Sequence, residues 1–175
     1  MRFLPTPLAG LFEVESDAHV DERGSFRRTW CASEFSAAGL DFSPLQASLS
    51  GNSRRLTLRG LHYQLAPHAE QKFVRCVQGR AFDVVVDLRE GSPTRWQHHA
   101  VELDAQRGNA LFVPRGFAHG FLTLLDHTTV EYLIDADFAP AAATGLRWND
   151  PRLGIAWPAM PEVISSRDAA WPLTD

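Results

Sequence analysis

Lysine, cysteine and tyrosine are all scarce in this chain of 175 residues. Lysine and arginine together number 17, yet Lys72 is the single lysine, and Tyr63 and Tyr132 are the only tyrosines. The two cysteines, Cys31 and Cys76, are too few and too far apart to predict a disulfide framework or a zinc site. No apolar run approaches the roughly 18–20 residues that a membrane span needs, so we expect no membrane partner.

The remaining composition is that of an ordinary globular chain. Hydrophobic residues make up 45% and charged residues 22%, and the length is sufficient to bury a full core, so we expect one domain over residues 1–175. The formal net charge of -4 predicts no nucleic-acid partner. The amino-terminal stretch lacks the long apolar block of a signal peptide, and we therefore expect a cytoplasmic protein.

Short strand-like runs, separated by Gly, Pro or Asp, recur along the chain and predict an all-β sandwich or small barrel. The turn 78–80 is expected to form a hairpin. One helix is predicted over 32–40, with Ser33 as its N-cap and Gly39 at its C-terminal end. The apolar segment 148–175 should pack back onto the barrel. The predicted strands are 10–16, 24–30, 56–64, 71–77, 81–89, 98–104, 109–114, 119–125 and 128–135.

One motif indicates the type of barrel. Gly108, Pro114, Gly116 and His119 follow the spacing G-x5-P-x-G-x2-H, which resembles the second signature of the cupin superfamily, with Thr123 where Asn is usual. The Pro-Gly turn between two strands would direct His119 into the barrel.

The first cupin signature, where metal ligands normally gather, is incomplete here. The sequence reads His62-Tyr63-Gln64, and Glu70 is followed two residues later by Lys72. Two imidazoles and one carboxylate make a poor dication site, and an ammonium in the same cavity would repel the ion. A metal-dependent cupin enzyme is therefore the weaker alternative, and we expect no metal.

The titratable residues suit proton transfer beside a carbonyl group. Strand alternation places His62 and Gly60 on one face and Arg59 on the other. If His62, Lys72, Asp83, His119 and Tyr132 point inward, a His can act as base. A Lys can then stabilise the enolate oxygen, and a Tyr can return a proton to the opposite face. We expect these groups to serve chemistry, because their burial for packing alone would be costly.

With these residues in place, the chain resembles the dTDP-4-dehydrorhamnose 3,5-epimerase family over nearly its whole length. The resemblance implies a cupin-type double-stranded β-helix, or jelly-roll barrel, with short peripheral helices. It also implies a nucleotide-diphosphate sugar as substrate, a homodimer that exchanges N-terminal strands, and no metal or redox cofactor. The matching segments are 21–26, 59–64, 71–94, 113–121, 148–151 and 167–172.

The resemblance further implies a role for each matching residue. His62 would be the base that removes the proton beside the 4-keto group, oriented by Asp168. Lys72 would stabilise the enolate, and Tyr132 would reprotonate the opposite face. The substrate-binding residues would be Arg23, Phe26, Arg28, Gln46, Arg59, Asp83, His119 and Phe138, with Arg23 and Phe26 reaching in from the partner subunit.

Four positions mark departures from the family pattern: Arg28 stands where Glu is usual and Phe138 where a second Tyr is usual, while Asn is usual near Ser48 and Glu near Ala143. Arginine offers donors where glutamate offers acceptors. We therefore hypothesise a different nucleotide-linked keto-sugar, or epimerisation at one carbon only. A sugar-nucleotide binding protein without catalysis is a further alternative, disfavoured by the retained His62, Asp168 and Tyr132.

Overall fold

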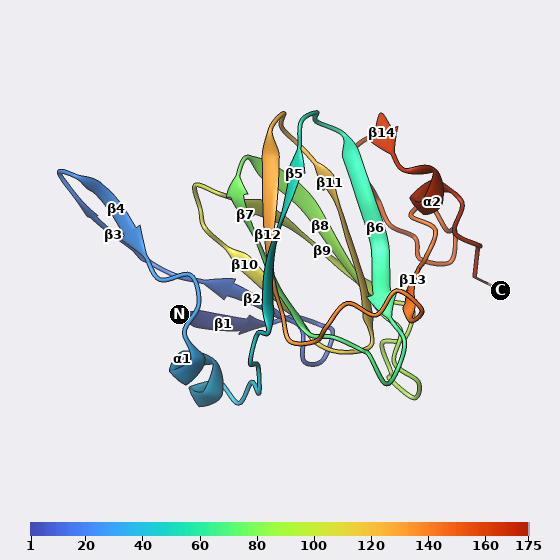
Figure 1. Cartoon of the computed structure of the whole chain (residues 1–175), viewed down its shortest axis with the longest axis horizontal. Coiled ribbons are helices and arrows are strands. Elements are labelled where there is room, and N and C mark those ends of the chain that lie inside the picture. The colour runs from blue at the N-terminus through green and yellow to red at the C-terminus, as the bar shows by residue number, and fades with distance from the viewer. Residues whose placement is uncertain (175) are drawn as a thin grey trace.

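The computed structural model describes residues 1–174, and its body is built from two facing β-sheets (Figure 1). The first sheet contains, in spatial order, β1 (Arg2–Pro5), β2 (Phe12–Glu15), β10 (Ala110–Val113), β7 (Lys72–Gln78), β12 (Thr128–Ile134) and β5 (Gln46–Asn52). The second contains β13 (Ala143–Gly145), β6 (Thr57–Gln64), β11 (Phe117–Thr123), β8 (Arg80–Asp87) and β9 (His98–Asp104). This arrangement confirms the predicted all-β jelly roll.

Five further elements complete the described structure. Strands β3 (Ala18–Asp21) and β4 (Gly24–Arg27) form a hairpin that extends away from the body (Figure 1). Strand β14 (Val163–Ile164) adds to β6 in parallel. The helices α1 (Ala32–Ala37) and α2 (Ser166–Ala169) are both short. Within residues 1–174, no helix has the length and apolar character that a membrane crossing requires.

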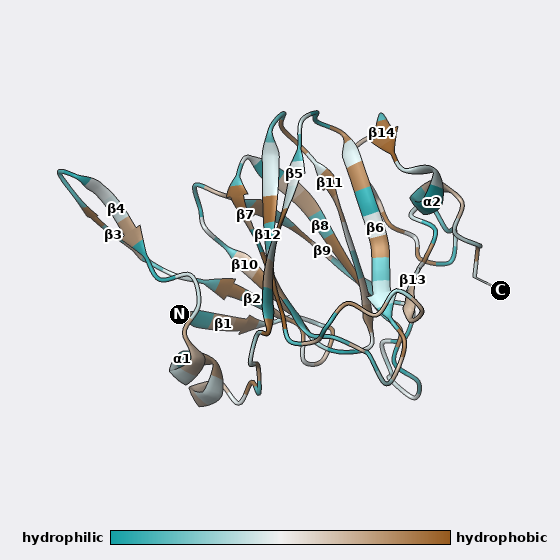
Figure 2. Ribbon diagram, viewed as in Figure 1, coloured by the Kyte–Doolittle hydropathy of each residue, from teal (hydrophilic) through white to brown (hydrophobic). Residues whose placement is uncertain are grey.

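Apolar side chains from both sheets fill the space between them. Val74 and Cys76 of β7 pack with Val85 of β8 and Phe121 of β11 in one buried cluster, and hydrophobic and hydrophilic bands alternate along β6 (Figure 2). This alternation follows from the period of two along a strand. Because the polar positions of several strands fall on the inner face at one end, the barrel contains a polar cavity beside its apolar core.

Strands β6 and β11 approach one another so closely that two glycines are required. A Cβ atom on Gly60 would lie 2.6 Å from Gly120 Cα, and one on Gly120 would lie 2.6 Å from the Arg59 carbonyl oxygen. The pairing register between these strands also shifts between His119 and Phe121. Strand β6 is therefore irregular at its centre, and strict alternation of its side chains ends there.

Two local predictions were wrong. The turn 78–80 does not form a hairpin, because β7 and β8 belong to different sheets and the turn at Gly79, with φ of +73°, carries the chain across. Helix α1 has Cys31 rather than Ser33 as its N-cap. Its predicted end is confirmed, since Gly39 has φ of +75° and its N–H donates to the Ser36 carbonyl.

The carboxy-terminal segment packs onto the barrel, as predicted. The indole Nε1 of Trp157 donates to the Trp148 carbonyl oxygen at 2.8 Å, and Trp157 packs against Phe82 of β8. The Ser165 hydroxyl accepts from the Asp168 N–H at 3.0 Å and caps α2. This cap holds Asp168, from the end of the chain, against β6.

Candidate active site

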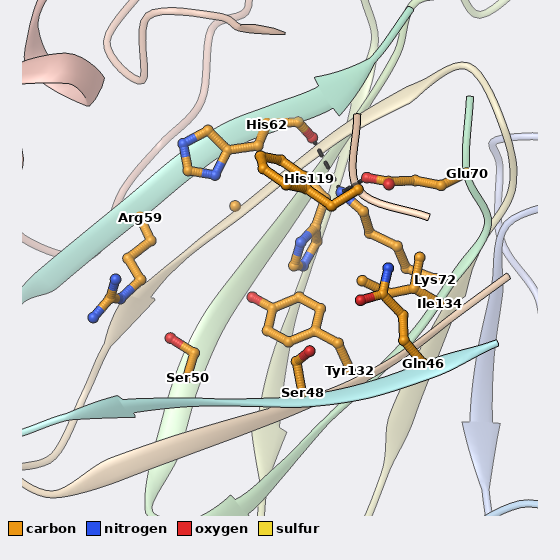
Figure 3. Close-up of a pocket in the computed structure, with 12 residues that line it drawn as sticks. Gln46, Ser48, Ser50, Arg59, His62, Glu70, Lys72, His119, Tyr132 and Ile134 are labelled. Carbon is orange, nitrogen blue, oxygen red and sulfur yellow. Dashed lines mark hydrogen bonds and ion pairs between the residues drawn. The ribbon is translucent and has the colours of Figure 1, made fainter. Parts of the chain in front are cut away.

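A cavity of about 360 Å³ lies between the two sheets (Figure 3). Its walls come from β5 and β12 of the first sheet and from β6 and β11 of the second, so residues from distant parts of the sequence meet there. Most of the lining side chains are polar or titratable. The lining residues are Gln46, Ser48, Ser50, Arg59, His62, Glu70, Lys72, His119, Gly120, Tyr132, Ile134 and Phe138.

His62 and Asp168 form a hydrogen-bonded pair on the β6 side of the cavity. The His62 Nε2 atom lies 2.7 Å from Asp168 Oδ1, and the Gly60 N–H donates to Asp168 Oδ2 at 3.1 Å. Burial alone would raise the pKa of Asp168, but the bonds from His62 and Gly60 hold that pKa below its ordinary value. An ionised Asp168 accepts a hydrogen bond from an Nε2 that carries a proton. The free lone pair of a neutral His62 is then on Nδ1.

Tyr132 lies in the opposite sheet, with its ring edge-to-face against His119 at a centroid distance of 5.7 Å. His119 Nε2 contacts both Asp83 carboxylate oxygens, at 2.8 and 2.9 Å, and both residues are buried. Burial and the nearby Asp83 raise the pKa of Tyr132 well above its usual value. The phenol is therefore protonated at neutral pH and can act as a proton donor.

Lys72 lies on the floor of the cavity, where it is buried. Its Nζ forms an ion pair with Glu70 Oε1 at 2.9 Å and donates to the main-chain carbonyl oxygen of His62 at 3.4 Å (Figure 3). The ammonium is thus held beside the strand that carries the His62 imidazole. A positive charge fixed in such a partly desolvated place is suited to stabilise a developing oxyanion.

Arg59 brings a second cation to the cavity. Its Nε donates to Asn52 Oδ1 at 2.8 Å, and the buried Asn52 donates in turn to the Ser50 and Thr128 carbonyl oxygens. The guanidinium is therefore held by one edge, and its other edge can bind an anionic group. Gln46 is also fixed, because its Nε2 donates to the Ala136 carbonyl oxygen at 2.6 Å.

The structure brings together most of the residues that the sequence proposed for the site. The cavity is lined by His62, Lys72, Tyr132, Gln46, Arg59, His119 and Phe138. Asp168 and Asp83 lie one bond behind it, against His62 and His119.

Three of the proposed residues lie elsewhere in the chain. Arg23 and Phe26 are on the exposed β3–β4 hairpin, where Arg23 pairs with Asp21. Arg28 follows this hairpin and forms an ion pair with Glu34 of α1 at 2.6 Å. None of the three lines the cavity of its own chain.

The expected separation of Arg59 and His62 onto opposite faces of their strand was wrong. Both line the cavity, because β6 is irregular at Gly60 and its register with β11 shifts there. Sequence reasoning also missed Ser50 as a lining residue, and considered Glu70 only as a metal ligand. The period-two pattern of Gln46, Ser48 and Ser50 was the available signal, but the run 46–52 was not recognised as a strand.

Six titratable side chains in or beside the cavity contact one another in pairs. Glu70 contacts Lys72, His62 contacts Asp168, and His119 contacts Asp83. In the part of the chain that the structure describes, no group of three or more His, Cys, Asp and Glu residues is arranged to hold a metal ion. The arrangement instead provides a base, a protonated phenol and a cation around one space. It can remove a proton from one face of a ligand and deliver a proton to the other.

Comparisons with known proteins point to one family. The family model described as dTDP-4-dehydrorhamnose 3,5-epimerase matches residues 5–175. A dTDP-4-dehydrorhamnose 3,5-epimerase of Sinorhizobium fredii is 42% identical over 148 residues, which cover 84% of this chain and 74% of that protein.

Solved structures also align with this chain over nearly its whole length. The dTDP-4-dehydrorhamnose 3,5-epimerase of Bacillus anthracis, with TDP and PPi bound, aligns with a TM-score of 0.96 and 35% identity over 99% of each chain. ChmJ, a 3'-monoepimerase from Streptomyces bikiniensis in complex with dTDP-quinovose, aligns with a TM-score of 0.91 and 36% identity over 97% of this chain and 86% of that one.

Proposed function

Because this chain belongs to the dTDP-4-dehydrorhamnose 3,5-epimerase family, we propose that its cavity epimerises a dTDP-linked 4-keto-6-deoxy sugar with His62 as base and Tyr132 as acid. The protein is an isomerase of the epimerase class, as its relatives are named. The observation that carries the assignment of roles is that His62 and Tyr132, from opposite sheets, line one cavity.

The reaction begins with proton abstraction from the carbon beside the ketone. Nδ1 of His62 takes the proton, the C–H electron pair forms a C=C bond, and the carbonyl oxygen becomes an enolate oxygen. Asp168 stabilises the resulting imidazolium through Nε2 at 2.7 Å. The Lys72 ammonium donates to the enolate oxygen, where charge develops.

The second step inverts the carbon. Tyr132 donates its phenolic proton to the same carbon from the opposite side, the C=O bond reforms, and the configuration is reversed. The raised pKa of the buried Tyr132 keeps this proton available at neutral pH. No electrons are gained or lost overall, so the steps require neither an oxidant nor a reductant.

The remaining cavity residues would bind the nucleotide sugar. Arg59, held by Asn52, would contact the diphosphate, and His119 with Asp83 would contact the sugar. Gln46 and Phe138 at the rim would contact the nucleoside. The Arg59 guanidinium suits the anionic diphosphate of such a ligand, and the aromatic ring of Phe138 suits its planar base.

We propose that a second copy of the chain completes the site. The β3–β4 hairpin extends from the body (Figure 1), Phe26 on it is 73% exposed, and the Arg23 side chain is 84% exposed. Such a projection suits a homodimer in which Arg23, Phe26 and Arg28 reach the partner's nucleotide. A cytoplasmic location fits the two free thiols, Cys31 and Cys76.

The alternative is epimerisation at one carbon, or action on a related keto-sugar. Ser48 and Phe138 line the cavity, and Ala143 lies beside it in a small side cavity shared with His62. These residues therefore lie where substrate contacts are expected, so their departures from the family pattern would alter recognition.

Turnover of the dTDP-linked 4-keto-6-deoxyglucose in D2O tests the proposal. Two deuterons in the product, counted by mass spectrometry, indicate exchange at both carbons, whereas one indicates a single-carbon epimerase. Unchanged exchange in the His62→Asn enzyme would refute the proposed role of His62.

A further inference from the structure

Among the described residues that line the cavity, Glu70 is the one carboxylate, and the mechanism above gives it no task. Its side chain is 11% exposed, and its Oε1 lies 2.9 Å from the Lys72 Nζ, whose side chain is 9% exposed. A buried ammonium is costly unless a counter-charge lies beside it. Glu70 is the group that provides this charge.

The bonds of Lys72 leave one direction open toward substrate. An ammonium has three N–H donors. One of them donates to the His62 carbonyl oxygen at 3.4 Å, and Glu70 Oε1 lies 2.9 Å from Nζ as an ion pair. Among the described residues Nζ has these two partners, so at least one donor remains for an oxygen atom in the cavity that Lys72 lines (Figure 3).

Glu70 is itself held in place by Gln64. The Gln64 Nε2 donates to Glu70 Oε2 at 2.6 Å and lies 3.2 Å from the Asp137 carbonyl oxygen. The Gln64 Oε1 accepts from the Ala139 N–H at 2.7 Å, which fixes the orientation of the amide. The side chain of Gln64 therefore cannot turn to offer its oxygen to residue 70 without losing that bond.

Both partners of the Glu70 carboxylate are consequently donors. A carboxylate meets them with two acceptor oxygens, whereas a glutamine at this position has one oxygen and one N–H2 group. In either orientation that amide would place a donor against Lys72 or against Gln64. The position therefore requires a charged group that only accepts.

We propose that Glu70, held by Gln64, is a positioning residue that keeps the Lys72 ammonium in place and directed at the enolate oxygen. This inference rests on the proposed function, since it assumes that an enolate forms beside Lys72. Glu70 does not exchange a proton with the sugar. It acts on the rate through Lys72 alone.

The test compares Glu70→Gln, Lys72→Met and the double variant with the wild-type protein by turnover of the dTDP-linked 4-keto-6-deoxyglucose in D2O. Glu70→Gln should lower kcat by roughly 10- to 100-fold, as expected for a misplaced catalytic group, while KM and the Kd of dTDP change by less than about twofold. In the Lys72→Met background the same substitution should have no further effect on kcat, because its target is gone. Glu70→Asp keeps two acceptors and should recover part of the lost rate.

Glu131→Gln is the matched control. Glu131 pairs with Arg75 at 2.6 Å across the neighbouring strands β12 and β7, but neither residue lines the cavity. It should retain the wild-type kcat. Thermal melting of each variant separates a loss of folded protein from a loss of rate.

A folded Glu70→Gln enzyme with the wild-type kcat would overturn the inference, as would additive effects of the Glu70 and Lys72 substitutions. If His62→Asn abolishes exchange in the same series, the proposed function stands and only the role of Glu70 fails. Exchange that persists in His62→Asn would instead refute the proposed function.

Discussion

Replacing Asp168 by Asn should disable the base without removing it. Asp168 Oδ1 accepts from His62 Nε2 at 2.7 Å, and Oδ2 accepts from the Gly60 N–H at 3.1 Å. The main-chain N–H of Gly60 can only donate, so an asparagine satisfies it by turning its single oxygen there. The N–H2 group then donates to Nε2 and moves the imidazole proton to Nδ1, the atom that must accept the substrate proton.

The expected loss follows from the value of a general base in the correct tautomer. Such a group contributes roughly 10²- to 10⁴-fold, and the wrong tautomer forfeits nearly all of it. We expect kcat to fall by about 10³- to 10⁴-fold, or roughly 4–5.5 kcal/mol of transition-state stabilisation. KM should change little, because Asp168 lies behind His62 and does not line the cavity.

The assay is the initial rate of deuterium incorporation from D2O, with thermal melting as a check of folding. Asp150→Asn is the control, since Asp150 is also buried in the carboxy-terminal segment but bonds to Thr174 and Arg152. It should change the melting temperature and not kcat. An Asp168→Asn enzyme within about threefold of the wild-type kcat, less than 1 kcal/mol, would refute the assigned tautomer.

Three further predictions concern single side chains. Tyr132→Phe should lower the rate at which inverted product forms by roughly 10²- to 10⁴-fold, while the recovered substrate still gains deuterium through His62. NMR of the recovered sugar measures this deuterium. Loss of both product formation and deuterium exchange would contradict the division of roles. Burial would raise the pKa of Asp87, but hydrogen bonds from Arg89, Ser92 and Thr94 hold that pKa far below its ordinary value. The contribution of Asp87 to the free energy of unfolding is therefore full above the unfolded-state pKa near 4 and falls as the pH drops below it. Urea unfolding should show a weaker pH dependence in Asp87→Asn, and an unchanged dependence would count against the ion pair. Alkylation of the folded protein at pH 8 should add one label, at Cys31, and mass spectrometry of the intact protein counts it. The Ser33 hydroxyl lowers the pKa of Cys31, whereas burial raises the pKa of Cys76 to about 12. Two labels on the folded protein would contradict the burial of Cys76.

The strands that the sequence predicted well are those with a period of two. Strand β9 (His98–Asp104) begins and ends at the predicted residues, and Asp83 and the apolar Val84 lie on opposite faces of β8, as a period of two requires. Strand β5 was missed because its hydrophobicity pattern is weak. Its inward positions are the polar Gln46, Ser48 and Ser50, and its outward positions are Ala47 and Leu49. Its recognition depends on pairing with β12, which is a tertiary contact.

The site shows the same limit of local reasoning. Lys72 and Tyr132 were identified because lysine and tyrosine are scarce in this chain, and His62 through its position in the first cupin signature; the structure gathers all three in one cavity. The family resemblance placed Arg59 in the site, but strand alternation could not, since its position beside His62 arises from the close contact of Gly60 with Gly120 on another strand. Long-range approaches of this kind leave no periodic pattern in the sequence.

A crystal structure with a dTDP-linked 4-keto sugar or a stable analogue bound would test the central claim most directly. We expect the His62 Nδ1 and the Tyr132 Oη on opposite faces of one sugar ring, each within about 2.6–3.2 Å of a proton-transfer position, and the Lys72 Nζ beside the keto oxygen. A sugar with both groups on the same face, or with Tyr132 out of reach of the ring, would contradict it.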